Sequence, residues 1–528
     1  MGVHMASRAV AGLSVGASFI AVIIGALGSW SAMAGPVSHT HTGAHHGTVA
    51  PGIAALTTLT NTDQADDGKT ATQAAGPRGI AHKAGGRVIP SLRGAAPVPQ
   101  LSSTGTLAAE PTLGITKNGS VFYVGLEQVG ARYEWPVMRT TNGRKWEEVS
   151  PTIGPVRRHV QGLDPMLHVD RDTGRIFTAD IQAVVGCSAM VSFSDDQGTS
   201  WTTSKVCGLT DHQNIFSGPP AVSTTIGYPN VVYYCAADGG ALAGYSTASS
   251  CVKSLDGGLT WLRTGEPAFY DDPNQEGGYL WEGHCAGLTA HGFVDQEGTV
   301  YLPRGYCGQP WLAISKDEGQ TWKRVQVATN GMAEDTEGEG GLEEHESAVA
   351  VDSKGNIYYV WAGRDRLPYL AVSRDGGDTW SKPLMIGVPR LRESSLPNMD
   401  IGADGRIAVA YIGSENAPGG SQPTGFGEAY EKATWNAYVT MTTDALAKDP
   451  IFFTTTVNDL KDPLVIGACE VVRCQQIFDF IDLDIAPDGT PWVALVDGCP
   501  PQGRDPVPCY PAWGRGFVAH LTGGPKLR

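Results

Sequence analysis

The chain has 528 residues, of which 41% are hydrophobic and only 17% are charged, and it contains 68 glycines. This composition is typical of many short strands joined by tight turns, and it argues against a helical protein. The formal net charge of −16 produces an acidic surface that repels phosphate backbones, so the sequence argues against nucleic acid as a partner.

Residues 1–34 have the pattern of an export signal. Arg8 is the only Lys or Arg before an uncharged stretch that ends in a small-x-small cleavage pattern at 32–34. The same stretch is long enough to cross a bilayer, so an uncleaved membrane anchor is the alternative. We therefore predict a secreted, extracellular protein, which contacts a membrane only if this segment stays attached.

Residues 35–105 are rich in Ala, Gly, Thr and Pro and contain few bulky apolar side chains. Such a composition predicts a mostly disordered, low-complexity linker. Its cluster of histidines between 39 and 46 could bind a transition metal, but a solvated polar tail is the simpler interpretation. Within the linker, Arg87–Pro90 is a short apolar island that we expect to dock as a strand.

A turn motif recurs through residues 106–528, which we predict to form one domain. The pattern Ser-x-Asp-x-Gly-x-(Thr/Ser)-Trp occurs at 194–201, 254–261, 315–322 and 373–380, with a shortened copy at 140–146 and a worn copy at 442–444. Repetition about every sixty residues indicates a propeller or a solenoid. In this turn, Gly takes positive φ, Ser and Asp bind turn amides, and Trp fills space between sheets. We therefore interpret these aspartates as structural and not catalytic.

A second hairpin signal, a polar residue followed by Gly and a β-rich run, precedes each of these turns. It occurs seven times, near residues 118, 172, 229, 297, 354, 404 and 488. We predict an all-β, seven-bladed propeller of four-stranded antiparallel blades, with a six-bladed propeller as the alternative. The last blade lacks one strand at the C-terminal end, and we expect the Arg87–Pro90 island to supply it and close the ring.

The Ser-x-Asp-x-Gly-x-Thr-Trp repeats resemble the Asp-box (BNR) repeats of sialidases, over roughly residues 108–523. The chain is similar to secreted bacterial proteins of that kind. In sialidases three arginines clamp the substrate carboxylate, a Tyr activated by a Glu is the nucleophile, and an Asp is the acid/base. The resemblance implies Arg304 and Arg364 as clamp members and Tyr438 as the nucleophile. The family's Arg-Ile-Pro motif is matched here only by Arg87-Val88-Ile89-Pro90, which has an inserted residue.

Ten cysteines fit an exported chain. Five disulfides between sequence neighbours are the simplest interpretation, although the sequence leaves their connectivity open. Strand order places all ten, together with the long insertions, on the propeller face opposite the repeated turns, and we expect the functional site there. The cysteines are Cys187, Cys207, Cys235, Cys251, Cys285, Cys307, Cys469, Cys474, Cys499 and Cys509.

Residues that open the innermost strands should surround the channel on that face. Paired carboxylates at such a mouth suit glycoside hydrolysis or the binding of a structural Ca²⁺, and no resident cofactor is expected. His284 and His291, on either side of Cys285, could act as general bases. The predicted catalytic residues are Asp164, Glu346, Tyr438 and Asp482, and the predicted substrate-binding residues are Arg304, Arg364, His212 and His284.

Two functions follow from these observations. The first is a secreted, sialidase-like glycoside hydrolase, which is what the resemblance and the charged channel mouth favour. The second is a non-catalytic propeller that binds an extracellular glycan, a cell-wall polymer or a protein, which the imperfect Arg-Ile-Pro match favours. In either case we expect a monomer.

Overall fold

The computed structural model describes residues 79–129, 132–153, 156–157, 163–181, 187, 189–238, 248–270, 289–306, 308–332, 347–418, 432–466, 469–470, 473–474, 480–498 and 514–528. All of them belong to one compact unit, which comprises residues 71–240 and 245–528. The predicted signal segment, residues 1–34, lies outside the described residues.

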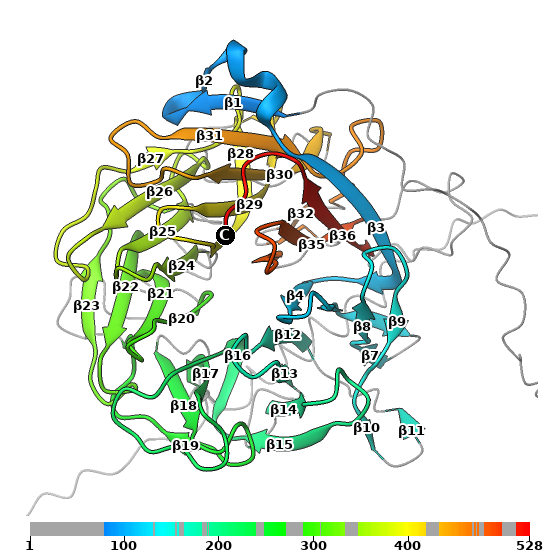
Figure 1. The fold of residues 1–528 in the computed structure, drawn as a ribbon, viewed down its shortest axis with the longest axis vertical. Coiled ribbons are helices and arrows are strands. Elements are labelled where there is room, and N and C mark those ends of the chain that lie inside the picture. The colour runs from blue at the N-terminus through cyan, green and yellow to red at the C-terminus, as the bar shows by residue number, and fades with distance from the viewer. Residues whose placement is uncertain are drawn as a thin grey trace, which may run out of the picture. The chain divides into compact units, whose positions relative to one another are not determined.

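Seven antiparallel sheets lie around a central axis as the blades of a propeller (Figure 1). Blades 1–3 consist of β4 (Thr112–Ile115), β5 (Val121–Val124), β8 (Val137–Thr140), β9 (Glu147–Glu148); β12 (Leu163–Val169), β13 (Ile176–Ile181), β14 (Ala189–Ser194), β15 (Thr202–Val206); and β16 (Leu209–Gly218), β17 (Val231–Asp238), β18 (Ser249–Ser254), β19 (Leu262–Arg263). Each blade is written from its innermost strand outward.

Blades 4–7 follow the same order. They consist of β20 (Phe293–Val294), β21 (Val300–Tyr306), β22 (Gln309–Ser315), β23 (Lys323–Gln326); β24 (Ser347–Val351), β25 (Ile357–Ala362), β26 (Pro368–Ser373), β27 (Leu384–Met385); β28 (Glu393–Ile401), β29 (Ile407–Ser414), β30 (Trp435–Thr442), β31 (Ile451–Thr456); and β34 (Asp482–Ile485), β35 (Pro491–Asp497), β36 (Gly514–Thr522), β3 (Val98–Ala108). The predicted seven-bladed propeller is confirmed, and the six-bladed alternative is wrong.

Short elements complete the described chain. Three two-stranded ribbons lie outside the blades: β6 (Glu127–Val129) with β7 (Arg132–Glu134), β10 (Thr152–Ile153) with β11 (Val156–Arg157), and β32 (Cys469–Glu470) with β33 (Arg473–Cys474). The helical elements among the described residues are two 3₁₀ turns, η1 (Ala84–Gly86) and η2 (Pro90–Ala95). None of the helices in these residues is long and apolar enough to span a membrane.

The ring is closed by an N-terminal strand, but the predicted segment is the wrong one. Strand β3, drawn in blue, pairs with β36, drawn in red, as the outermost strand of blade 7 (Figure 1). Strand β2 (Arg87–Val88) instead pairs with β1 (Ile80–Lys83), and β1 extends blade 6 along β31. The island at 87–90 is too short to satisfy the nine-residue edge of β36, whereas β3 has eleven residues. Ordered strands thus begin inside the range 35–105, where we expected a linker.

The repeated Ser-x-Asp turns join the third and fourth strands, as predicted. In the first copy, Ser194 Oγ donates to Asp196 Oδ1 at 2.8 Å and accepts the Gly198 amide at 2.9 Å. Asp196 Oδ1 also accepts the Ser200 amide at 2.8 Å. These hydrogen bonds, led by the one from the Ser200 hydroxyl, lower the pKa of Asp196. The carboxylate is therefore occupied in holding the turn, which is a structural role.

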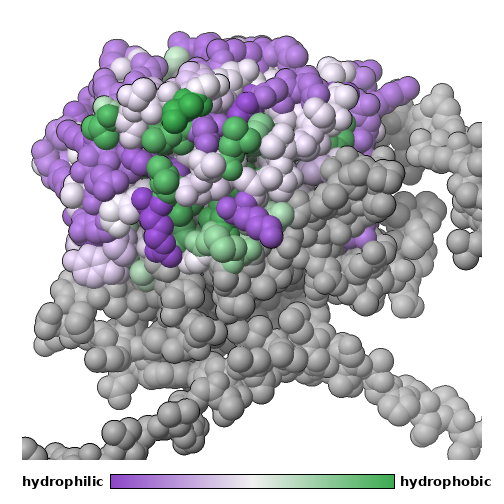
Figure 2. All heavy atoms as spheres, turned by 90° about the horizontal axis from the view of Figure 1, so that it is seen from below, coloured by the Kyte–Doolittle hydropathy of each residue, from purple (hydrophilic) through white to green (hydrophobic). Residues whose placement is uncertain are grey.

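In three of the four full copies of the motif, those ending at Trp201, Trp261 and Trp322, the indole nitrogen of the tryptophan bonds the preceding blade. Trp201 Nε1 donates to the Val149 carbonyl in blade 1 at 2.7 Å, and Trp261 Nε1 donates to Ser204 Oγ in blade 2 at 2.8 Å. Apolar side chains also fill the space between blades: one cluster joins Ile412 and Trp435 of blade 6 to Leu495 of blade 7. The core therefore lies between neighbouring sheets, and the outer surface in Figure 2 shows hydrophobic side chains only in small groups among hydrophilic ones.

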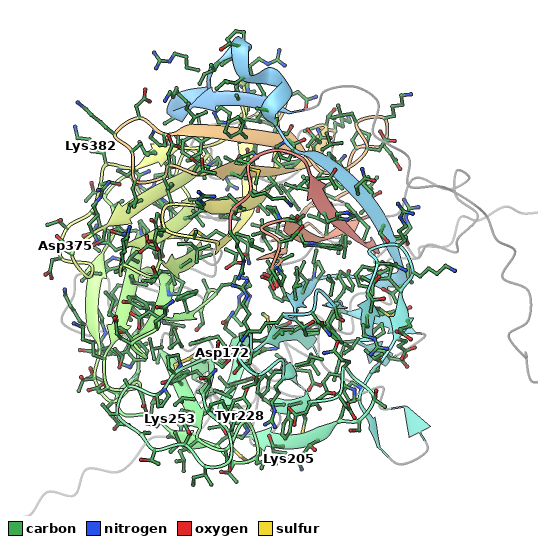
Figure 3. The ribbon with its side chains drawn as sticks, viewed as in Figure 1. Asp172, Lys205, Tyr228, Lys253, Asp375 and Lys382 are labelled. Atoms are coloured by element: carbon green, nitrogen blue, oxygen red, sulfur yellow. A yellow bond between two sulfur atoms is a disulfide. The ribbon has the colours of Figure 1, made fainter. Side chains whose placement is uncertain are left out.

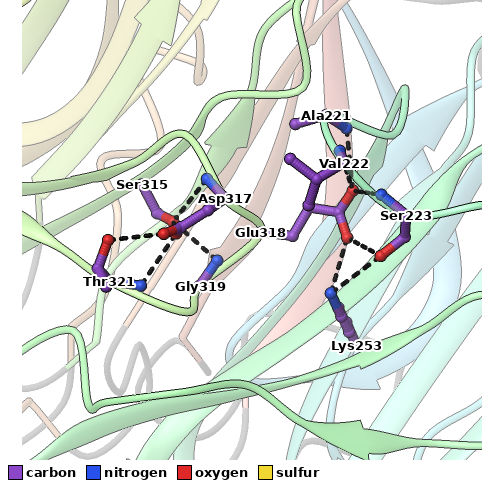
Figure 4. Close-up of polar contacts among 9 residues, drawn as sticks. All are labelled: Ala221, Val222, Ser223, Lys253, Ser315, Asp317, Glu318, Gly319 and Thr321. Atoms are coloured by element: carbon purple, nitrogen blue, oxygen red, sulfur yellow. Dashed lines mark hydrogen bonds and ion pairs between the residues drawn. The ribbon is translucent and has the colours of Figure 1, made fainter.

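The first hairpin of blade 3, residues 219–230, is the longest first hairpin of the seven, and a buried ion pair holds it. Glu318 Oε1 accepts the amides of Ala221, Val222 and Ser223 at 3.0, 2.8 and 2.8 Å, and Glu318 Oε2 pairs with Lys253 Nζ at 2.7 Å (Figure 4). Burial alone would raise the pKa of Glu318, but hydrogen bonds from Lys253 and Ser223 lower it to about 2. We call these residues the Glu318 cluster.

Two of the five predicted disulfides lie among the described residues, and both join sequence neighbours. Cys187 bonds Cys207 in blade 2, and Cys235 bonds Cys251 across β17 and β18. Strand pairing also places Cys469 opposite Cys474 in the ribbon of β32 and β33. The Cys187–Cys207 and Cys235–Cys251 disulfides lie at the end of the blades away from the repeated turns. Cys285, Cys307, Cys499 and Cys509 lie outside the described residues.

Candidate functional site: the central channel

The seven innermost strands surround a channel with a cavity volume of about 780 Å³. It reaches the hairpin face, which we define as the end of the propeller that carries the first hairpins and the repeated turns. Figure 3 shows Asp172 on the inner side of its blade, and Asp375 and Lys382 at the outer rim. The charged side chains and histidines that line the channel are Asp170, Asp172, Asp295, Asp352, Asp400, Asp404, Asp482, Asp484, Arg171, Arg528, His168 and His291.

Three of these aspartates hold first hairpins and are saturated. Asp295 Oδ1 accepts two turn amides at 2.9 Å, and its Oδ2 accepts the Tyr301 hydroxyl at 2.9 Å. Asp352 has the same arrangement with Tyr358 at 2.8 Å. In blade 2 the position of these tyrosines is taken by Phe177, which has no hydroxyl group. Asp170 Oδ2 instead accepts the hydroxyl of Tyr228 from the next blade, at 2.5 Å. These carboxylates are structural in the same way as those of the Ser-x-Asp turns.

Arg171 crosses the channel near the hairpin face. Its hairpin contains one residue more than those after Asp295 and Asp352, and the guanidinium reaches Asp400 Oδ2 of blade 6 at 2.5 Å and Asp484 Oδ1 of blade 7. Arg528 lies beside them and donates to the Ile485 carbonyl at 2.7 Å. We call Arg171, Asp400, Asp484 and Arg528 the Arg171 cluster. It joins blade 2 to blades 6 and 7, and no backbone pairing among the described strands does so.

The inner carboxylates also bind the neighbouring blade through its amides. Asp482 Oδ2 accepts the Leu113 amide at 2.9 Å, and Asp484 Oδ2 accepts the Ile115 amide at 2.8 Å. Burial raises the pKa of Asp482 to about 8, and the charge on Asp484 adds to the shift. Burial likewise raises the pKa of Asp484 to about 6 against the attraction of Arg171. Asp482 therefore carries a proton at neutral pH and can donate a hydrogen bond in the channel.

A hydrogen-bonded row of three side chains lies in the wall formed by blades 2 and 3. His168 Nε2 lies 2.8 Å from Ser217 Oγ, and Ser217 Oγ donates to Asp170 Oδ2 at 3.0 Å. Burial lowers the pKa of His168 to about 4, so the ring is neutral at pH 7. At the boundary between blades 3 and 4, Asn214 Oδ1 accepts a hydrogen bond from the Gly292 amide at 3.2 Å. Asn214 Nδ2 lies 3.4 Å from His291 Nδ1.

Of the predicted catalytic residues, Asp482 lines the channel, whereas Asp164 does not. Asp164, Glu110 and His212 are buried where the inner strands of blades 2, 1 and 3 begin, with positive φ of 49°, 49° and 45°. The ring of His212 packs edge-on against Phe480, as does that of His291, each with centroids 6.4 Å apart. The sequence therefore located the start of these strands, but the side chains of Asp164, Glu110 and His212 are not among those that line the described cavity.

The residues assigned by the sialidase resemblance lie apart from one another. Arg304 is fully buried in β21, donates to Ser249 Oγ at 3.1 Å and lies 5.6 Å from the Phe269 ring centroid. Tyr438 is on the third strand of blade 6 and stacks on Tyr411, with centroids 5.4 Å apart. Arg364 is exposed after β25. None of the three lines the described channel. Glu346 and His284 lie outside the described residues, and these roles stay predictions.

Five residues of the channel wall were not predicted from the sequence: His168, Ser217, Arg171, Asp400 and Asp484. A signal for three of them was present: inner strands contain polar residues at alternate positions, as in His168-Val-Asp170, Asn398-Met-Asp400 and Asp482-Leu-Asp484. Because successive side chains of a strand face opposite ways, such pairs face one side together. The pairing of Arg171 with Asp400 and Asp484 carries no local signal, because these two carboxylates come from other blades.

Metal binding finds no support within the described ranges. No three His, Cys, Asp or Glu side chains among them are grouped so that they could hold a metal ion. The structural Ca²⁺ stays a prediction for the rest of the chain.

The fold and the channel thus define a seven-bladed β-propeller with a polar central channel. A scan against protein-family models finds no match, and neither does a search of curated proteins. Among solved structures, the chain is similar to the BP39L lectin from Burkholderia pseudomallei (10% identity, 74% of this chain and 93% of that one, TM-score 0.44). It is also similar to an α-L-arabinofuranosidase from Fusarium graminearum (13%, 70% and 98%, 0.38) and to a leech intramolecular trans-sialidase (12%, 74% and 65%, 0.33). At these identities the similarity concerns the fold.

Proposed function

We propose that the protein is a secreted Asp-box propeller that binds an extracellular glycan in its central channel. The observation that carries this proposal is the channel itself: its volume of about 780 Å³ falls within the range of small-ligand sites, and polar side chains held by their neighbours line it. Amides, hydroxyls and neutral imidazoles at fixed positions suit a ligand that offers many hydroxyl groups. The cysteine pairs and the export pattern of residues 1–34 support an extracellular location.

A second candidate function is glycoside hydrolysis, and one observation favours it. Asp482 is half-buried in the channel wall, and desolvation raises its pKa to about 8, so it is protonated at neutral pH. A protonated carboxyl group is what a glycosidase needs as its general acid. The partner carboxylate that hydrolysis also needs would be the predicted Glu346, because Asp164 does not line the channel.

Binding and hydrolysis are separated by one experiment on the full-length protein. The secreted protein is titrated calorimetrically with a panel of neutral and acidic oligosaccharides, and each mixture is then analysed for released sugars. We expect saturable binding of at least one oligosaccharide, weakened by Asp482→Asn and unchanged by Asp378→Asn at the exposed outer rim. Release of sugar that is lost in Asp482→Asn identifies a hydrolase. Absence of binding across the panel overturns the proposed function.

A further inference from the structure

We infer that the channel selects an uncharged, hydroxyl-rich sugar over an anionic one, and that His168 Nδ1 accepts a hydrogen bond from one of its hydroxyl groups. This inference rests on the proposed glycan-binding function and names its ligand class. It departs from the sialidase resemblance, which implies an acidic sugar held by arginines.

The charges of the channel wall disfavour an anion. The described lining contains eight aspartates but only two arginines and no lysine. Arg171 is already paired with Asp400 and Asp484. The Arg528 guanidinium lies near the same carboxylates and donates a hydrogen bond to the Ile485 carbonyl. Along the described walls a sugar carboxylate would therefore meet one cation without an ion pair, Arg528, which lies beside Arg171 and among the charges of Asp400 and Asp484, and it would be repelled by the surrounding aspartates.

An arginine clamp would have to come from elsewhere in the ring. Arg304 points away from the channel, since its guanidinium lies between Ser249 and the rings of Phe269 and Tyr306. Arg364 is exposed beyond the end of β25, and it is absent from the lining. The described structure therefore brings neither predicted clamp residue to the channel.

The hydrogen bonds around Ser217 fix which nitrogen of His168 carries the proton. The Ser217 hydroxyl has one hydrogen, and it is donated to Asp170, which can only accept. Ser217 Oγ must then accept the second hydrogen bond, so His168 Nε2 is the protonated nitrogen. Asp170 is held in place by Tyr228 and Asn230, which donate to the same oxygen at 2.5 and 2.9 Å. The relay therefore leaves Nδ1 with an unshared electron pair.

This electron pair is available to a ligand. His168 is half-buried and lines the channel, and its Nδ1 has no partner in the part of the chain that the structure describes. A neutral imidazole nitrogen accepts from a hydroxyl group but gains nothing from a carboxylate, which has no hydrogen to donate. Asn214 and Asn398, whose amides are hydrogen-bonded to Gly292 and Ile481, add further uncharged groups to the wall. The wall beyond the Arg171 cluster thus matches a polyol.

The test titrates the full chain with matched neutral and acidic sugars. The pairs are the methyl ester of 3′-sialyllactose with 3′-sialyllactose, and methyl-esterified tetragalacturonate with tetragalacturonate, so that the members of a pair differ only by the esterification that removes the charge. We expect at least one neutral member to bind, and its acidic counterpart to bind at least about tenfold more weakly, equal to about 1.4 kcal/mol.

Variants then test the role of His168. His168→Leu removes the acceptor, and Ser217→Ala breaks the relay while Asp170 keeps its other donors. We expect each to weaken neutral-sugar binding about three- to tenfold, the worth of one hydrogen bond. Ser192→Ala is the matched control, because Ser192 bonds Thr203 on the outer strands of blade 2. Nitrogen-15 spectra of the imidazole rings should show the Nε2-protonated form of His168 in the wild type and a mixture in Ser217→Ala.

The outcomes separate the two proposals. If no oligosaccharide binds, the proposed function fails and the ligand class fails with it. If an acidic sugar binds more tightly than its neutral partner, glycan binding stands and the inference is overturned. If a neutral sugar binds but His168→Leu binds it equally well, or the wild-type proton resides on Nδ1, the assigned role of His168 is wrong.

Discussion

Two buried ionic clusters of this propeller use the same chemical groups and reach opposite electrostatic states. In the Glu318 cluster one carboxylate receives three amides, a hydroxyl and an ammonium group, and its pKa falls to about 2. In the channel two carboxylates, Asp400 and Asp484, share Arg171, and Asp482 lies beside them without an arginine of its own. Against the effect of burial, Arg171 lowers the pKa of Asp400, whereas burial raises the pKa values of Asp482 and Asp484 to about 8 and about 6. The ratio of donors to carboxylates decides between them. A cluster with surplus donors holds a loop, whereas a cluster with surplus carboxylates keeps a transferable proton.

The largest expected effect comes from removing the saturated carboxylate. Glu318→Ala leaves the Lys253 ammonium group buried without its partner, so we expect the free energy of unfolding to fall by about 3–5 kcal/mol. Urea denaturation measures it. Glu318→Gln combined with Lys253→Met removes both charges and keeps an acceptor for the amides of residues 221–223, so this double variant should lose less stability than Glu318→Ala. Glu297→Ala, on an exposed turn, is the control. A loss below about 1 kcal/mol for Glu318→Ala would contradict a structural role.

The next effect is a pH dependence due to Asp482. Its folded pKa of about 8 lies above its ordinary value of 3.8, so the native state binds the extra proton between these pH values. The stabilisation is complete below pH 4 and is lost as the pH rises through 8. The free energy of unfolding of the wild type should be higher at pH 5 than at pH 7. We expect this difference to be about 2–3 kcal/mol larger than the corresponding difference in Asp482→Asn. Equal pH profiles for the two proteins would show that Asp482 is ionised at neutral pH.

Removing the shared cation should have a smaller effect. Arg171→Met leaves Asp400 and Asp484 without their arginine, but the Arg171 side chain is 36% exposed, and water screens the charges that remain. We expect a loss of about 1–3 kcal/mol at pH 7, between the values for surface and buried pairs. The loss should shrink at pH 5, where Asp484 accepts a proton. Arg390→Met, which breaks an exposed pair with Glu415, is the control. A loss that grows at pH 5 would refute the sharing of Arg171.

The smallest expected effect is local and concerns the N-terminal strand on blade 6. His82 Nε2 lies 2.7 Å from Thr454 Oγ1 in a buried site, and burial lowers the pKa of His82 below 6.5. Docking of the neutral ring is therefore fully favourable above pH 6.5 and weakens as the pH falls below it. Hydrogen exchange of the amides of β1 should accelerate between pH 6.5 and 5, after correction for intrinsic rates, while the amides of β36 stay protected. Uniform exchange of both strands would count against a local effect.

Much of the architecture was predictable because its signals are local. In each hairpin the Gly, and in each repeated turn the Ser and Asp, form hydrogen bonds with backbone groups only a few residues away. A recurring pattern of these residues therefore predicts recurring blades. The structural role of Asp196 was predictable for the same reason. Asp482 was correctly placed at the channel because it opens an inner strand, although its proton depends on burial that only packing creates.

The remaining features depend on groups that meet only after the ring has closed. Strand β3 was read as linker, since nothing near Val98–Ala108 indicates that β36, some four hundred residues later, needs a partner. The partners of Arg171 in blades 6 and 7 and the buried orientation of Arg304 are also set by distant segments.

The sequence by itself determined the number of blades, the position of the turns and the face that carries them, because short-range hydrogen bonds and the period of strands specify these features. The tertiary structure alone decided which carboxylates share one arginine, which carboxyl group of the channel keeps a proton, and which histidine nitrogen bonds Ser217. These properties arise from burial and from contacts between blades, and no local pattern of residues encodes either.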